Sequence, residues 1–159
     1  MQVDNQLIAD IARQAVAKSA PQELPLFRGL SAAYFDDPAK AVRAHAGKDE
    51  MLGFGAGDAA AFITPAALAV ATAVVQFVFT QVVSAVKNES ASLIAKYTRK
   101  LFGLAVDDGA ALKPLNFDAD QLARVRGLAL EKARQLNLPD AQAALLADAL
   151  CGSLAAAGK

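Results

Sequence analysis

The sequence predicts an all-α protein, and three observations support this. Hydrophobic residues make up 55% of the 159 residues, and much of this share is Ala, the strongest helix former. Apolar side chains recur at helical spacing in segment after segment. There is no Trp, and there are only six Pro. We therefore expect a helical bundle of about six helices, with one long central apolar helix and a C-terminal αα-hairpin.

The charge balance and the cysteine count argue against several classes of protein. The 16 basic and 16 acidic residues give a net charge of zero, which argues against nucleic acid as a partner. The single cysteine, Cys151, rules out an intrachain disulfide and favours a reducing compartment. The N-terminal stretch "MQVDNQLIADIARQ" has early acidic residues and no apolar run of signal-peptide length, so no cleavable secretion signal is expected.

The first helix is predicted to start at Asp4 or Asn5, either of which can cap it, and to end near Ser19, ahead of Pro21. Its apolar positions follow the i, i+3, i+4, i+7 pattern of an amphipathic helix. They are Leu7, Ile8, Ile11, Ala12, Ala15 and Val16.

An apolar segment follows, and it contains three of the ten aromatic residues: Phe27, Tyr34 and Phe35. Asp37–Pro38 then has the pattern of a cap and a first helical residue, and Gly47 is the expected end of that helix.

Three alternating glycines, Gly53, Gly55 and Gly57, precede the long apolar segment. A phosphate-binding loop is disfavoured, because no hydrophobic strand precedes them and no Gly-Lys-Ser/Thr follows. We interpret them as a flexible or close-packed joint. The same joint would also let the chain re-orient on entering a membrane.

The central segment is helical by its periodicity. Valine recurs every fourth residue, whereas a strand would alternate every second one. The positions are Val70, Val74, Val78, Val82 and Val86.

Thr64–Pro65 provides a cap and a helix start, and neither Pro nor Gly occurs again before Gly103. The prediction is one helix over about residues 65–102. Alternatively the helix breaks at "KNES", where Asn88 or Ser90 can cap a new helix.

Two environments fit this segment. Residues 59–86 carry no charge. This uncharged stretch is longer than the ~20 apolar residues that a membrane span requires. The segment also carries a polar stripe at every fourth residue: Thr72, Gln76, Thr80 and Ser84. In a membrane this stripe would face other copies of the helix, in a channel or a hydrogen-bonded oligomer. In a soluble bundle it would face solvent. A soluble state that releases the helix on a trigger is a third possibility.

A basic cluster formed by Lys96, Arg99 and Lys100 follows the apolar segment. Interleaved with apolar residues, it suits contact with acidic lipid, and the alternative is a solvated helix end. If the segment spans a membrane, these cations place the C-terminal side in the cytoplasm.

The expected organisation is a helical domain over residues 1–103, a linker over 104–117 and a helical hairpin over 118–159. Asp118 or Asp120 opens the hairpin, and Asn137–Pro139 separates its two helices. We interpret the hairpin as a cytosolic module that binds a partner protein.

No catalytic, cofactor or metal site is expected. The single histidine, His45, cannot form a histidine-based metal cluster. The acidic pairs Asp36–Asp37 and Asp107–Asp108 lie at helix caps or turns, and Cys151 lies near an apolar helix face without a histidine partner.

The sequence therefore predicts a non-enzymatic, membrane-active or membrane-anchored helical protein that self-assembles into a homo-oligomer, with pore formation or membrane disruption as the concrete form. The alternative is a soluble, cytoplasmic helical adaptor or scaffold that binds a protein partner through its helix faces. No nucleic acid partner is expected.

Overall fold

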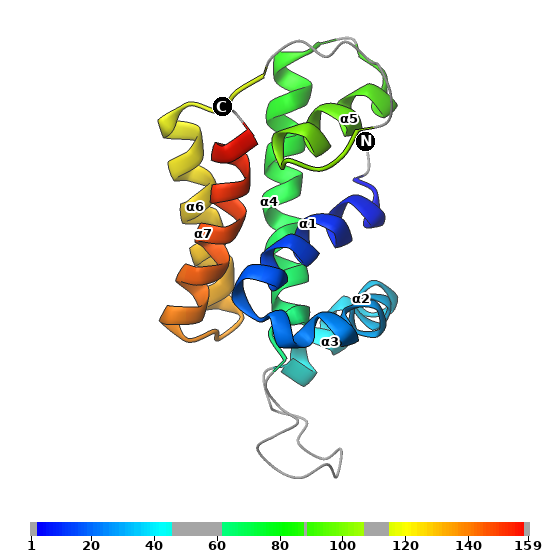
Figure 1. Ribbon diagram of the computed structural model, residues 1–159, viewed down its shortest axis with the longest axis vertical. Coiled ribbons are helices and arrows are strands. Elements are labelled where there is room, and N and C mark those ends of the chain that lie inside the picture. Colours follow the sequence, from blue (N-terminus) through cyan, green and yellow to red (C-terminus); the bar gives the residue numbers. More distant parts are fainter. Residues whose placement is uncertain (1–2, 46–61, 88, 107–114, 158–159) are drawn as a thin grey trace.

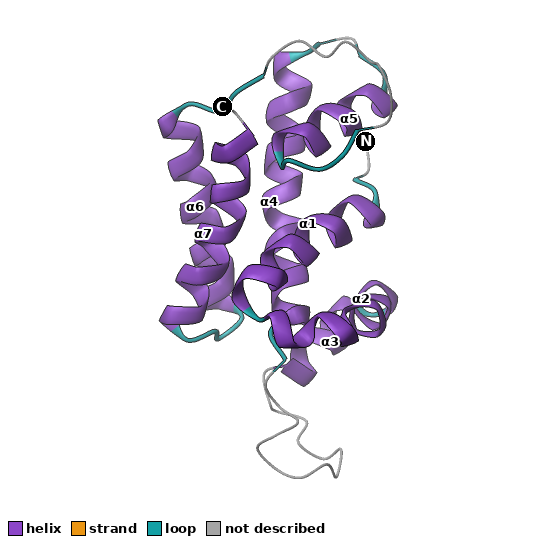
Figure 2. Cartoon of the chain, viewed as in Figure 1, coloured by secondary structure: helices purple, strands orange, loops and turns teal. Residues whose placement is uncertain are grey.

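The computed structural model describes residues 3–45, 62–87, 89–106 and 115–157, and these ranges contain seven α-helices, one 3-10 helix and no strand (Figures 1 and 2). The all-α prediction is confirmed. In chain order the elements are α1 (Asn5–Ser19), η1 (Pro21–Leu26), α2 (Phe27–Asp36), α3 (Pro38–His45), α4 (Thr64–Ala85), α5 (Ala91–Leu101), α6 (Ala119–Gln135) and α7 (Asp140–Ala157).

Helix α4 is the central element of the bundle (Figure 1). It contacts α1, α2, α3, α5 and α6, and the α6–α7 hairpin lies along one side, with α7 also packed on α1. The first eight residues of α4, 64–71, are all buried. Beyond them only one face is buried, formed by Val74, Val75, Val78, Phe79 and Val82. The predicted long central apolar helix is therefore the core of the fold.

The N-terminus of α4 is capped by a carboxylate from another helix. Glu23 of η1 is only 4% exposed. Its Oε2 accepts the backbone N–H of Ile63 at 2.9 Å, and its Oε1 accepts the N–H of Thr64 at 2.9 Å and the Thr64 hydroxyl at 2.6 Å. The first N–H groups of a helix have no partner within the helix, and its dipole favours negative charge there.

The sequence prediction that Thr64 caps α4 is therefore wrong. Thr64 is already helical, and the residue at the cap position, Ile63, supplies no side-chain bond. The Thr64 hydroxyl donates to Glu23 instead of accepting from its own helix.

The single helix predicted over residues 65–102 is also wrong, and the alternative break is the one observed. Helix α4 ends at Ala85, and the Ser90 side chain caps α5 by accepting the Leu93 N–H at 3.2 Å. Helix α5 then packs back on α4, with Ile94 and Leu101 buried. A continuous helix would leave that apolar face in water, so the break is favoured by burial.

The predicted caps of the N-terminal helices are confirmed. Asp4 accepts the Gln6 N–H at 3.2 Å at the start of α1. Asp37 accepts the Lys40 N–H at 3.1 Å and so caps α3.

The C-terminal hairpin is confirmed. Asp118 and Gln121 form a reciprocal capping box at the start of α6. Asn137 adopts a φ of 64° in the connection to α7, a left-handed conformation that Asn tolerates better than most residues. The buried side chains of α6, including Val125 and Ala133, belong to the same core as α4.

Candidate functional site

The polar stripe of α4 faces outward in the bundle. Gln76, Thr80 and Ser84 are exposed, and Thr72 is half-buried at the start of the stripe. The Thr80 hydroxyl donates to the Gln76 carbonyl at 2.9 Å, within its own helix. Beyond Thr72 the stripe therefore lies at the surface of the bundle.

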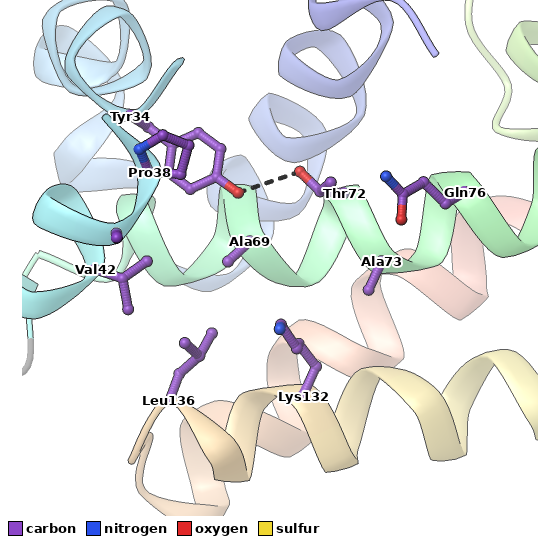
Figure 3. Close-up of a pocket in the computed structure, with 10 residues that line it drawn as sticks. Tyr34, Pro38, Val42, Ala69, Thr72, Ala73, Gln76, Lys132 and Leu136 are labelled. Atoms are coloured by element: carbon purple, nitrogen blue, oxygen red, sulfur yellow. Dashed lines mark hydrogen bonds between the residues drawn. The ribbon is translucent and has the colours of Figure 1, made fainter. Parts of the chain in front are cut away.

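The stripe begins in a groove where α2, α3, α4 and α6 meet (Figure 3). This groove, called the α4 groove below, is open to solvent and has a volume of about 380 Å³. Thr72 and Gln76 belong to both the stripe and the groove. The lining residues are Tyr34, Pro38, Ala39, Val42, Ala69, Thr72, Ala73, Gln76, Lys132 and Leu136.

Hydroxyl groups link α2 to α4 beside the groove. The Thr72 hydroxyl donates to the Leu68 carbonyl at 2.7 Å, which uses its only hydrogen. The contact of 3.3 Å between the Tyr34 and Thr72 hydroxyls, drawn in Figure 3, therefore has Tyr34 as its donor. The Tyr34 oxygen keeps its lone pairs for a further donor.

Lys132 supplies the cation of the groove. Its side chain extends from α6 toward α4, near Ala69 and Ala73 (Figure 3), and it is half-buried. None of the lining residues is acidic.

No acidic residue lies one helical turn from Lys132 on its own helix. The residues three and four positions away, where an intrahelical ion pair would form, are Leu128, Ala129, Gln135 and Leu136. The ion pairs found between described residues join Arg99 to Asp10, Arg126 to Asp148 and Arg134 to Asp140. Within the described ranges, the ammonium of Lys132 thus has no carboxylate partner.

The basic cluster predicted on α5 is divided by its contacts. The Arg99 guanidinium pairs with Asp10 of α1 at 2.9 Å and donates from Nε to the Ala105 carbonyl at 3.3 Å. Lys96 is half-buried and Lys100 is exposed. Arg99 thus ties α5 to α1, and Lys100 is the exposed cation of the three. The glycine joint, Gly53, Gly55 and Gly57, lies outside the described residues.

Cys151 has the environment of a packed thiol. It is half-buried, and its Sγ donates to the Leu122 carbonyl at 3.6 Å. Burial raises the pKa of the thiol, the charge of Asp148 raises it further, and Arg126 opposes both. The protonated thiol is a poor nucleophile at neutral pH. The described residues contain no group of three or more His, Cys, Asp or Glu placed to hold a metal ion.

Comparisons with protein-family models, with curated proteins and with solved structures gave no match to this chain. The candidate site therefore rests on geometry. Sequence reasoning missed Lys132 of the α4 groove, and it also missed Glu23, which caps α4 and does not line the groove. Lys132 did leave a signal, since it lies three residues after Ala129 and four before Leu136, on the apolar side of α6. Glu23 left none, because its partners are 40 and 41 residues away.

Proposed function

We propose that this protein is a water-soluble, non-enzymatic helical adaptor of the cytoplasm. It binds a partner protein along the α4 face, which comprises the α4 groove and the exposed stripe residues Thr80 and Ser84. The observation that carries this proposal is the division of α4: one apolar face is buried, and the polar stripe is exposed from Gln76 onward.

Burial accounts for the apolar character of α4 without a membrane. A helix that is apolar on all sides is stable in water when neighbours surround it, as they do over residues 64–71. The exposed large apolar residues among those described are Leu26, Val83 and Leu145, each on a different helix. Scattered residues of this kind are normal on a soluble protein and form no membrane-binding patch.

The α4 face has the properties of a binding surface. It is concave at one end, and its groove combines an apolar lining with a few polar groups, as binding sites commonly do. It is built on helices and so is presented rigidly, which lowers the entropic cost of association.

The first test is the state of the purified protein. We expect a monomer in detergent-free buffer by light scattering, no flotation with vesicles of neutral and acidic phospholipids, and no release of entrapped dye. Recovery in the vesicle fraction together with dye release would contradict the adaptor proposal.

The second test locates the partner surface. A photo-crosslinking amino acid at Thr80 should capture a partner protein in cells. The same group at Arg13, exposed on α1, is the matched control and should not capture it. Equal capture from both positions would remove the α4 face from the proposal.

A second candidate is the membrane-active homo-oligomer, and the dimensions of α4 favour it. Its 22 residues extend about 33 Å, close to the ~30 Å hydrocarbon core of a bilayer. Its composition also suits a membrane span, although 61% of its most apolar window is buried inside the bundle. Insertion would require α4 to leave its neighbours and break the bonds to Glu23, after which Thr72, Gln76, Thr80 and Ser84 would face one another.

The two candidates differ in their response to stripe substitutions. In a channel, Gln76→Leu with Thr80→Leu would abolish conductance or change the assembly. In the adaptor, the same double variant would enlarge the exposed apolar surface and promote aggregation.

A further inference from the structure

The α4 groove has the size to accept apolar side chains. Its volume of about 380 Å³ falls within the range of ~300–1,000 Å³ that is usual for ligand sites. Ala69 and Ala73, one helical turn apart on α4, both line it. Because these side chains are single methyl groups, they leave room that larger residues would fill. Pro38, Val42 and Leu136 complete an apolar wall around them.

The charge in the groove selects the occupant. Lys132 is half-buried with no carboxylate partner among the described residues, and the lining contributes no negative charge. An occupant with a carboxylate would therefore meet complementary charge, whereas a cationic one would be repelled. Because Lys132 as a whole is half-buried, the attraction would be less screened than at a fully exposed lysine.

Further polar groups suit a polypeptide backbone. The Tyr34 oxygen can accept an N–H, because its own hydrogen is donated to Thr72. The Gln76 side chain is exposed, and no described residue hydrogen-bonds its amide, so it offers both a donor and an acceptor.

We propose that the α4 groove binds a segment of a partner protein that carries an Asp or Glu beside apolar side chains. The apolar side chains lie over Ala69 and Ala73, and the carboxylate pairs with Lys132. The groove is open to solvent and continues into the exposed stripe, which fits a chain segment rather than an enclosed small molecule. This inference rests on the adaptor function and adds the chemistry of the partner.

The experiment is a selection from a random library of displayed 12-residue peptides on the full-length protein. Parallel selections use Lys132→Met and the matched control Lys18→Met, an exposed lysine on α1. We expect the peptides enriched on the wild type to share an acidic residue next to apolar ones. They should also be enriched on Lys18→Met and much less enriched on Lys132→Met.

A synthetic form of the leading peptide then isolates the ion pair by calorimetry. Changing its carboxylate to the amide should weaken binding to the wild type by about tenfold and leave binding to Lys132→Met unchanged. Ala73→Leu should weaken both peptides by occupying the groove. Ala73 is half-buried, so this variant should keep the wild-type helical circular dichroism, which confirms that the fold is intact.

Three results would overturn the inference: no enrichment on the wild type above Lys132→Met, enriched peptides without acidic residues, or equal binding of the acid and amide peptides. If the peptides failed to bind Thr80→Lys but still bound Lys132→Met, they would bind the stripe and not the groove. The adaptor function would then be supported and the inference about the groove contradicted. If the protein inserted into vesicles and still bound the acidic peptides specifically, the inference about the groove would stand and the adaptor function would be contradicted.

Discussion

The two ends of α4 both lack charged residues, but their surroundings differ. Residues 64–71 are buried on every side, and their start is closed by Glu23. Toward Ala85 the helix is buried on one face and exposed along its polar stripe. The average hydropathy of α4 therefore describes neither end. At the N-terminal end apolarity serves the core, and at the C-terminal end the spacing of a few polar residues determines which face remains in water.

The largest loss of stability is expected from Glu23→Ala, which removes the cap at the buried end of α4. The change would leave the N–H groups of Ile63 and Thr64 and the Thr64 hydroxyl without their buried acceptor. We expect a loss of about 3 kcal/mol in the free energy of unfolding, measured by urea denaturation. Glu131→Ala, at an exposed position on α6, is the matched control and should change stability by less than about 0.5 kcal/mol. Equal effects of the two variants would show that the Glu23 cap contributes nothing special.

A pair of valines compares the buried and exposed sides of α4 directly. Val74 is fully buried and Val83 is 36% exposed. Val74→Ala should cost about 2 kcal/mol by leaving a cavity. Val83→Ala should be nearly neutral, because lost contacts are offset by the higher helix propensity of Ala. Thermal unfolding of both variants tests the contrast, and a larger effect at Val83 would contradict the placement of the stripe.

The contribution of the α5 cap to the break after α4 can be tested by removing that cap. Ser90→Ala eliminates the bond to the Leu93 N–H and should cost about 1 kcal/mol. Ser92→Ala, at an exposed position in the first turn of α5, is the control and should have little effect. Hydrogen exchange should show faster opening of α5 in Ser90→Ala and no change at the start of α4. Unchanged exchange in α5 would argue that packing alone places the break.

The smallest expected effect on folding comes from the stripe itself. Thr80→Ala removes an exposed hydroxyl that bonds only within its own helix. The free energy of unfolding should change by less than about 0.5 kcal/mol, because surface substitutions seldom do more. A large destabilisation, measured by urea denaturation, would mean that the stripe is buried against something in solution.

Local sequence patterns predict most of the fold. The spacing of Leu7, Ile11 and Ala15 predicts α1, and the caps at Asp4 and Asp37 were identified from residue type and position alone. Both are short-range effects, settled within one helical turn.

The errors arose where distant residues decide. Whether the segment after Thr64 forms one helix or two depends on whether α5 finds a surface to pack on, which periodicity does not reveal. The cap of α4 comes from Glu23, far away in the chain. The packing of α3 and of α6 on α4, which brings Val42 and Lys132 to one groove, is likewise set by tertiary structure.

The cap of α4 also has a consequence for biosynthesis. Glu23 precedes Thr64 by 41 residues, so it leaves the ribosome first. At ~5–20 residues per second, the carboxylate is available roughly 2–8 s before the helix that it closes is made. The most apolar segment of the chain thus emerges when the groups that shield its first turn already exist. Moving the first helices to the C-terminus by circular permutation would reverse this order, so the segment would be synthesised before its cap and would be more exposed to aggregation.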